Sequence, residues 1–280
     1  MTFVALRTIE LRGVSVRHHA ATGSAPHALR EISFSVSAGE QVAVIGSSGA
    51  GKTTLLHLLS AALRPDAGEL KLFGNDPWQL ANTDRHALRA RLFLAPQTPP
   101  LPPRQRVVTT VLAGRMPQWS LWQAVRSLIK PVDPEAAYQA LARFNLQDKL
   151  YARVDRLSGG ERQRCGMARL LLSNAELFLV DEPLSALDPT LSRQTLTTLL
   201  QEAATRNATL ICSLHHVEFA RAFFPRIIGL REGSVAFDLQ REEVTDAMVE
   251  ALYQNEHDGV ISPAPEPALE PPLVIDPRSF

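Results

Sequence analysis

GSSGAGKT at residues 46–53 is the stretch of this sequence that decides the fold. It matches the pattern G-x-x-x-x-G-K-[ST], whose glycines let the backbone approach phosphate oxygens that a Cβ atom would block. The short apolar run QVAVIG before it predicts a buried parallel strand, and TTLLHLLSAALR after it has the apolar spacing of a helix. This order favours a phosphate site in an α/β fold over a glycine-rich turn that binds no ligand.

The side chains of this loop predict a bound nucleotide and a metal ion. Lys52 is expected to reach the β- and γ-phosphates, and the Thr53 hydroxyl is expected to bind Mg²⁺. The predicted nucleotide-binding residues of the loop are Gly46, Ser47, Ser48, Gly49, Ala50, Gly51, Lys52, Thr53 and Thr54.

An acidic pair ends a second apolar strand, LFLVDE at 177–182. Hydrolysis of a nucleotide needs an acid that supports the metal and a group that positions water. Asp181 is predicted to hold Mg²⁺, directly or through water, and Glu182 to act as general base on the attacking water. Alone, an ordinary acidic strand end would explain the pair better, but the phosphate loop favours hydrolysis.

A second helix start suited to anions lies in RLSGGERQRCGMAR at 156–169. Free backbone N–H groups and the positive end of the helix dipole meet at such a start. Ser158 is placed to cap the helix, and Glu161 occupies the capping-box position. A capped surface helix and a phosphate contact are compatible, because the cap exposes the amides that would bind phosphate.

Composition excludes several classes of protein. The chain has 280 residues with 45% apolar residues, enough for one large domain or a domain with a sub-domain. Lysine plus arginine number 29 and aspartate plus glutamate 29, so no basic field points to nucleic acid as a partner. Cys165 and Cys212 lie in different segments, which favours free thiols in a reducing compartment.

No apolar run approaches the ~20 residues that span a bilayer, and the N-terminus lacks a signal-peptide core. A soluble chain is therefore expected, and any membrane role would come through a partner.

The pattern of elements predicts a mixed-sheet core with an N-terminal antiparallel β region and a helical sub-domain. The expected core spans 1–97 and 158–257, and the helical sub-domain 98–157. TPPLPPRQR at 98–106 cannot be regular structure, since proline removes donors and fixes φ. RIIGLREGSVAFDL predicts a hairpin that turns at Glu232 and Gly233. Residues 258–280 are proline-rich and predicted to be disordered.

Together these motifs resemble those of ATP-binding cassette (ABC) ATPases. LSGGERQR at 157–164 is similar to the family signature, LFLVDE to the Walker B strand, and SALD at 185–188 to the D-loop. Gln97 takes the place of the Q-loop glutamine, and His215 that of the switch histidine. The resemblance covers roughly residues 7–255, with the motifs in the family's order. It implies a P-loop NTPase of ABC-ATPase type.

The resemblance implies a homodimer arranged head to tail. ATP on the phosphate loop of one subunit would meet Ser158, Gly159 and Gly160 of the other, which agrees with the exclusion of water on closure. It also implies ATP and Mg²⁺ as cofactors, integral membrane permease subunits and a separate periplasmic solute-binding protein as partners, and a peripheral place on the cytoplasmic face of the inner membrane.

Three further site residues follow from the resemblance. Gln97 would sense the γ-phosphate through Mg²⁺ or water; the alternative is a solvated loop glutamine. Either His215 or His216 would hydrogen-bond the γ-phosphate and hold Glu182. The spacing from LICSL favours His215 and makes His216 a solvated neighbour; the alternative for His215 is a core histidine with no role. His18 stands where family members stack adenine on an aromatic residue, although imidazole offers less surface than tyrosine.

Some stretches are similar to phosphonate-import ATP-binding proteins in particular. These are VLAGRMPQWSLWQAV, LHHVEFARAFFPRIIGLREGSVAFD and AMVEALYQNE. The rival classes are an importer ATPase for another small solute, an exporter-type cassette and a non-transport ABC protein acting on DNA or ribosomes. The single cassette, short insertion and balanced charge count against the last class, and a simple P-loop switch protein would not explain LSGGERQR.

Overall fold

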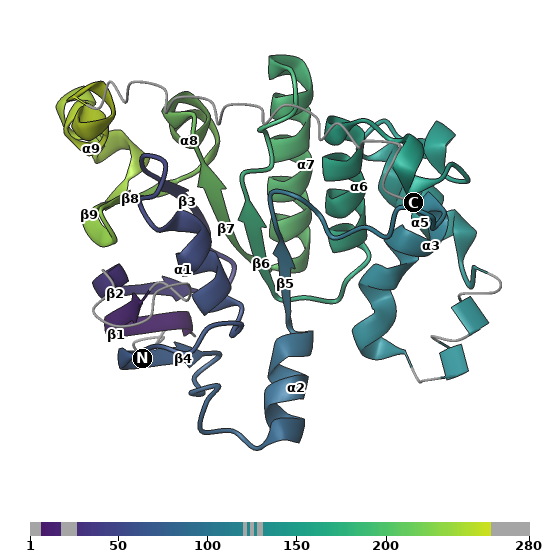
Figure 1. The fold of residues 1–280 in the computed structure, drawn as a ribbon, viewed down its shortest axis with the longest axis horizontal. Helices are drawn as coiled ribbons and strands as arrows, with labels where there is room; N and C mark the ends of the chain where they lie inside the picture. Colours follow the sequence, from purple (N-terminus) through teal and green to yellow (C-terminus); the bar gives the residue numbers. More distant parts are fainter. Residues whose placement is uncertain (1–6, 18–26, 120–121, 124–125, 128–130, 259–280) are drawn as a thin grey trace, which may run out of the picture.

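The computed structural model describes residues 7–17, 27–119, 122–123, 126–127 and 131–258 (Figure 1). Two sheets form its framework. The smaller sheet has strand order β2-β1-β4 and is antiparallel, and the larger has order β5-β6-β7-β3-β8-β9. The smaller sheet contains β1 (Arg7–Arg17), β2 (His27–Ser37) and β4 (Ala67–Leu72).

The larger sheet is mixed. Its strands are β3 (Gln41–Ile45), β5 (Leu92–Ala95), β6 (Leu177–Asp181), β7 (Thr209–Leu214), β8 (Arg226–Arg231) and β9 (Ser234–Gln240). Strands β5, β6, β7, β3 and β8 pair in parallel, and β9 pairs antiparallel with β8. The hairpin expected at Glu232 and Gly233 is thus confirmed.

Burial on both faces explains why the central strands are continuously apolar. In β6, Phe178 and Val180 belong to one hydrophobic cluster, whereas Leu177 and Leu179 belong to the other. Successive strand residues point to opposite faces, so a strand covered on both sides has no polar face.

Helices cover both faces of the larger sheet. In chain order, the helices are α1 (Lys52–Leu59), α2 (Asn82–Ala90), α3 (Val107–Leu112), α5 (Pro134–Ala142), α6 (Gly159–Leu171), α7 (Pro189–Arg206), α8 (Val217–Phe223) and α9 (Asp246–Asp258). Short 3₁₀ turns are η1 (Ala113–Gln118), η2 (Gln147–Lys149), η3 (Val154–Arg156) and η4 (Arg241–Glu243). The apolar face of α1 packs between the two sheets, and α6 and α7 cover the opposite face of the larger sheet (Figure 1).

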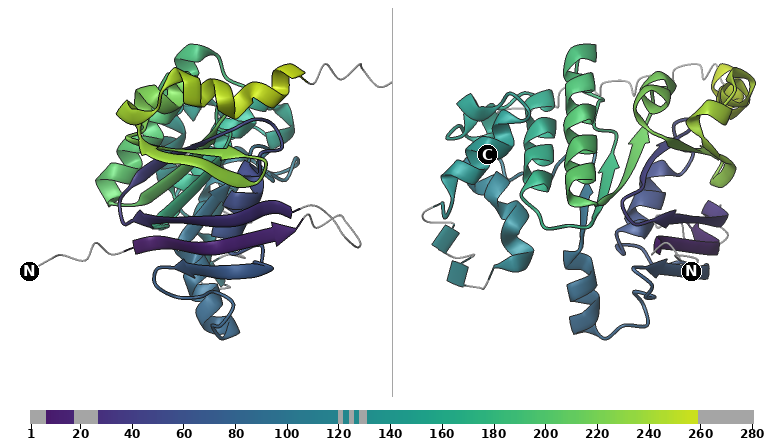
Figure 2. Two further views of the ribbon diagram at one scale, coloured as in Figure 1. Left: turned by 90° about the vertical axis from the view of Figure 1, so that its left-hand side faces the viewer. Right: turned by 180° about the vertical axis from the view of Figure 1, so that it is seen from behind.

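Arg226 joins the two sheets. Its guanidinium donates to Asp238 Oδ1 at 2.7 Å on β9 and to the Ser35 carbonyl at 2.9 Å on β2. It also donates to Glu40 Oε1 at 2.8 Å. The hydrogen bonds to Asp238 raise the pKa of Arg226, so this cation stays charged. Figure 2 shows the smaller sheet stacked beside the β8–β9 hairpin, where this junction lies.

The α/β fold with a mixed sheet, an antiparallel region and added helices is confirmed. The elements assigned between 98 and 157 are helical, and 98–106 is irregular, as expected. Residues such as Leu141 of this segment share one hydrophobic cluster with Phe178 of the sheet. The division into a core and a sub-domain stays a prediction. His18 and the tail from 259 onward lie outside the described residues.

Two local expectations need correction. The helix after the phosphate loop ends at Leu59 instead of running through LSAALR, because Ala61 adopts a left-handed φ of 53° that breaks it. Helix α2 and strand β5 lie between 75 and 97, where no element was predicted. Within the described part of the chain, no helix is both long and apolar enough to cross a membrane.

Candidate functional site

The phosphate loop joins the end of β3 to the start of α1. Gly46 has φ 155°, and a Cβ atom there would lie 2.3 Å from the Leu230 carbonyl oxygen. Gly51, which precedes α1, has a left-handed φ of 102°. Both positions therefore require glycine, and the loop wraps tightly before its amides meet the helix start.

Lys52 lies inside this loop. Its side chain is buried, with 4% of the residue exposed. The ammonium group donates to the carbonyl oxygens of Gly46 at 2.7 Å and Ser47 at 3.0 Å. These carbonyls hold the charge beside the loop, where phosphate oxygens would offer stronger, charge-assisted hydrogen bonds.

A cavity of about 320 Å³ opens on the loop. It brings together residues from three predicted motifs and one predicted switch: Ser48, Gly49, Gly51, Lys52, Thr53, Thr54, Gln97, Glu182 and His215. The loop, Gln97 after β5, Glu182 after β6 and His215 after β7 all follow the carboxyl ends of neighbouring strands, where ligands bind in open α/β sheets.

Glu182 and His215 are in direct contact. His215 Nε2 lies 2.6 Å from Glu182 Oε1, and their side chains are 42% and 11% exposed. A carboxylate brings no proton to this contact, so the imidazole donates its Nε2–H. His216 lines an adjoining cavity of about 260 Å³ together with Glu182 and His215, but the histidine in contact with the Glu182 carboxylate is His215. The geometry thus favours His215 over His216 as the histidine that holds Glu182.

Asp181 is buried beside them, with 3% of the residue exposed. Ser213 Oγ donates to Asp181 Oδ1 at 2.6 Å and accepts the Glu182 backbone N–H at 3.0 Å. Ser213 is fully buried on β7. Sequence reasoning missed this residue, although a serine inside the apolar run TLICSL, two positions before His215, was the available signal.

The residues predicted to hold a metal ion offer only oxygen atoms. Thr53 and Gln97 line the same cavity, and Asp181 lies next in the chain to Glu182, which also lines it. A hydroxyl, an amide oxygen and a carboxylate form a donor set that suits Mg²⁺. Within the described residues, no three His, Cys, Asp or Glu side chains gather into a metal site of their own.

The second helix start is built as expected. Ser158 Oγ accepts the Glu161 N–H at 3.2 Å, and Glu161 Oε2 accepts the Ser158 N–H at 2.8 Å. This is the predicted capping box. Ser158 and Gly159 are exposed, and they are not among the residues that line the phosphate-loop cavity. A single chain therefore presents two separate helix starts whose geometry suits an anion.

Tyr253 on α9 is a second residue that sequence reasoning missed. Its hydroxyl accepts the Gly46 N–H at 3.2 Å and donates to the His215 carbonyl at 3.4 Å. Helix α9 thereby contacts both the phosphate loop and the loop after β7. Both partners of the Tyr253 hydroxyl are distant in sequence, so the local pattern of AMVEALY gave no sign of these contacts.

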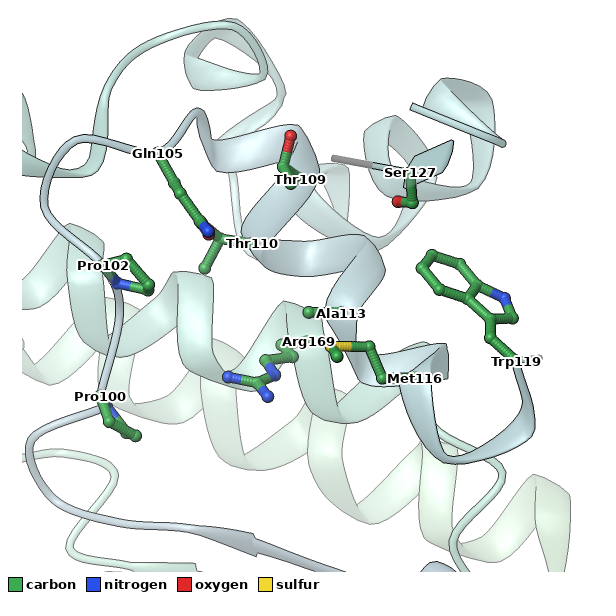
Figure 3. Close-up of a pocket in the computed structure, with 10 residues that line it drawn as sticks. All are labelled: Pro100, Pro102, Gln105, Thr109, Thr110, Ala113, Met116, Trp119, Ser127 and Arg169. Atoms are coloured by element: carbon green, nitrogen blue, oxygen red, sulfur yellow. The ribbon is translucent and has the colours of Figure 1, made fainter. Parts of the chain in front are cut away.

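A groove of about 330 Å³ lies between the proline-rich segment and α3 (Figure 3). Its lining is mostly apolar and consists of Pro100, Pro102, Gln105, Thr109, Thr110, Ala113, Met116, Trp119, Ser127 and Arg169. Arg169 reaches it from α6, between the prolines and Met116 (Figure 3). Burial lowers the pKa of Arg169, and its buried Nε has no hydrogen-bond partner among the described residues.

Comparison with known proteins agrees with this geometry. A family model described as "ABC transporter" matches residues 29–185. The chain is 61% identical over 245 residues to Phosphonates import ATP-binding protein PhnC 2 of Albidiferax ferrireducens, with 88% of each chain covered. It is 57% identical to Phosphonates import ATP-binding protein PhnC of a Polaromonas species, with 95% of this chain and 98% of that protein covered.

Solved structures show the same fold. The ATP-binding cassette MJ0796, in a dimeric post-hydrolysis state bound to ADP and Pi, superposes with a TM-score of 0.72 at 23% identity, covering 83% of this chain and 98% of that one. The cbiO1 subunit of Clostridium perfringens superposes with a TM-score of 0.70 at 20% identity, covering 89% and 95%. With the family model across more than half of its length and these close relatives, the chain belongs to the ABC transporter family of ATP-binding cassettes.

Proposed function

We propose that this chain is the ATP-hydrolysing subunit of a bacterial importer for phosphonate or a related phosphorus oxyanion. The observation that carries the proposal is the cavity in which Lys52, Glu182 and His215 meet. The phosphonate assignment rests on relatives of 61% and 57% identity that bear that name. The working place of such a subunit is the cytoplasmic face of the inner membrane.

Each residue of the cavity has a chemical task in hydrolysis. The loop amides and Lys52 bind the phosphates of ATP, and Glu182 takes a proton from the attacking water. His215 holds the Glu182 carboxylate through the 2.6 Å contact, and 42% of its side chain is exposed, which leaves the ring accessible to the γ-phosphate. Ser213 bonds both the Asp181 carboxylate and the Glu182 amide, so the acidic pair is oriented before ATP binds.

Thr53, Gln97 and Asp181 would hold Mg²⁺. When bound, the ion neutralises charge on the phosphate oxygens. Ser213 leaves the second oxygen of Asp181 for such a contact, because its hydroxyl bonds Oδ1 alone.

The unit that hydrolyses ATP is a homodimer of this chain. Ser158 and Gly159 are exposed and stand apart from the cavity of their own chain, so a second copy is needed to bring them to the nucleotide. Closure would add a second helix start to the γ-phosphate and exclude water.

The groove of Figure 3 is the surface proposed for the permease. It adjoins the segment that follows Gln97, so a change in the nucleotide cavity would reach a partner bound in the groove through this segment. A half-buried guanidinium in an apolar groove is costly without an anion. The permease segment is therefore expected to be apolar and to bring a carboxylate to Arg169.

Transport by the reconstituted complex tests the proposed function. The full chain, its permease and its solute-binding protein are placed in vesicles, and ATP hydrolysis is measured with methylphosphonate, phosphite or sulfate. We expect methylphosphonate or phosphite to stimulate hydrolysis and uptake, and Glu182→Gln to abolish both. Stimulation by an unrelated solute alone would assign the chain to another importer.

The permease surface has its own test. Arg169→Gln should leave the ATPase activity of the free chain intact and remove most of its stimulation by the permease. Arg64→Gln, the same change at an exposed arginine outside the groove and the predicted motifs, is the control. Equal stimulation of both variants would place the permease elsewhere.

A further inference from the structure

The backbone of Glu182 is held in an unusual conformation. Its φ is 47°, in the left-handed region that non-glycine residues rarely occupy, and Pro183 follows it. Such a residue costs free energy and persists only where its surroundings hold it. The contacts that hold this backbone therefore set where the carboxylate points.

Ser213 on β7 makes one of these contacts: its Oγ accepts the N–H of Glu182 at 3.0 Å. Ser213 lies two residues before His215, which holds the Glu182 carboxylate. The N–H and the side chain of Glu182 are thus fixed by the same strand end.

The other contact is to the carbonyl of Glu182 and comes from the signature helix. Gln163 Nε2 donates to the Glu182 carbonyl at 2.6 Å and lies 3.2 Å from Ser185 Oγ. Gln163 is 2% exposed, and its Oε1 has no hydrogen-bond partner among the described residues. The amide therefore works as a donor, and it spans the turn that follows the acidic pair.

The start of the same helix is pressed against that turn. A Cβ atom at Gly160 would lie 2.6 Å from the Ala186 carbonyl oxygen and 3.1 Å from Leu187 Cδ2. Glycine is required there by close approach, in addition to any contact with phosphate. Close packing at Gly160 and the hydrogen bond at Gln163 thus fix one turn of α6 to residues 182–187.

We propose that Gln163 is a positioning residue that ties the signature end of α6 to the general base of its own chain. The inference rests on the proposed function, in which Ser158–Gly160 contact the ATP held by the partner subunit. Movement of this helix start reaches the Glu182 carbonyl through Gln163. The position of Glu182 in each subunit therefore depends on the nucleotide bound to the other subunit.

Replacement of the donor tests the role of Gln163. Gln163→Met keeps a similar length and volume but removes the amide, and Gln139→Met makes the same change on the exposed face of α5. We expect Gln163→Met to lower kcat about tenfold while KM for ATP changes less than twofold, which marks loss of a transition-state interaction. Gln139→Met should match the unmodified chain. Unchanged kcat in Gln163→Met, or a rise in KM without a fall in kcat, would overturn the proposal.

Mixed dimers separate action within a chain from action across the interface. One subunit carries Glu182→Gln, so a single site hydrolyses ATP. Gln163→Met in the subunit with intact Glu182 should slow that site about tenfold. Gln163→Met in the Glu182→Gln subunit should change the rate little, although the signature of that subunit completes the active site. The reverse pattern would refute the link. Absence of ATP hydrolysis by the unmodified chain would instead contradict the proposed function.

Discussion

At the scale of single residues, the site is built by pairs that hold one another. Glu182 is fixed at its carboxylate by His215, at its N–H by Ser213 and at its carbonyl by Gln163. A carboxylate held in this way loses little freedom when water and phosphate arrive, which suits the role of general base proposed for Glu182.

Removal of the histidine should therefore slow chemistry more than binding. We expect His215→Ala to lower kcat for ATP hydrolysis about a hundredfold with little change in ATP affinity, because the proposed base Glu182 loses the contact that holds its carboxylate, and general bases contribute on this order. His216→Ala is the matched neighbour and should retain most activity. The opposite ranking of the two variants in a phosphate-release assay would assign the switch to His216.

The two thiols give a prediction for pH. Burial raises the pKa of the Cys165 thiol to about 12, and burial followed by the nearby Asp181 charge raises the pKa of Cys212. The folded chain keeps these protons above pH ~8.5, where the unfolded thiols lose them. The free energy of unfolding should therefore fall as pH rises above that value, by up to about 1.4 kcal/mol per pH unit for each thiol.

Denaturant unfolding between pH 7.5 and 9.5 measures this slope. The variant Cys165→Ala with Cys212→Ala should show a shallower decline than the unmodified chain. Parallel curves for the two proteins would mean that the thiols titrate alike in the folded and unfolded states.

At the scale of elements, α6 is the helix on which the motifs converge. Its start packs against Ala186, Gln163 reaches Glu182, and Arg169 lies in the groove. A Cβ atom at Gly166 would lie 2.7 Å from Pro99 Cγ, so the segment after Gln97 packs directly on this helix. One helix thus contacts the base, the turn after it and the proline-rich segment.

Gly166→Ala should therefore destabilise the chain despite the better helix propensity of alanine. We expect a loss of about 1–3 kcal/mol in the free energy of unfolding, typical of overpacking against a rigid neighbour. Gly159→Ala is the control, because a Cβ atom there meets nothing within 4 Å. Chemical denaturation compares them, and equal stability of the two variants would show that Pro99 yields without cost.

The elements also show what sequence could and could not supply. The phosphate loop, the buried strands and the capping box carry local signals, such as glycine spacing and Ser158 three residues before Glu161. Helix α2 was missed because only Leu88 of its residues is buried, and β5 because Pro96 cuts it to four residues at the sheet edge. Ser213, Gln163 and Tyr253 act through partners distant in sequence, which no local pattern reveals.

At the scale of the whole molecule, the chain carries two helix starts suited to anions, whereas one nucleotide has one triphosphate. The start of α1 belongs to the cavity with Glu182, and the start of α6 is exposed outside it. A dimer accounts for the second helix start, since each nucleotide would contact one start from each chain.

Ser158→Arg should then leave ATP binding by the monomer intact and prevent dimer closure, as equilibrium binding and light scattering can measure.

Sedimentation velocity of Glu182→Gln with ATP and Mg²⁺ tests the dimeric site most directly. We expect this variant to bind ATP without activating water, so that the closed state accumulates. We predict a dimer that retains two ATP molecules, and a monomer once Ser158→Arg is added. A Glu182→Gln chain that stays monomeric at saturating ATP, or that hydrolyses ATP at the unmodified rate, would contradict the account.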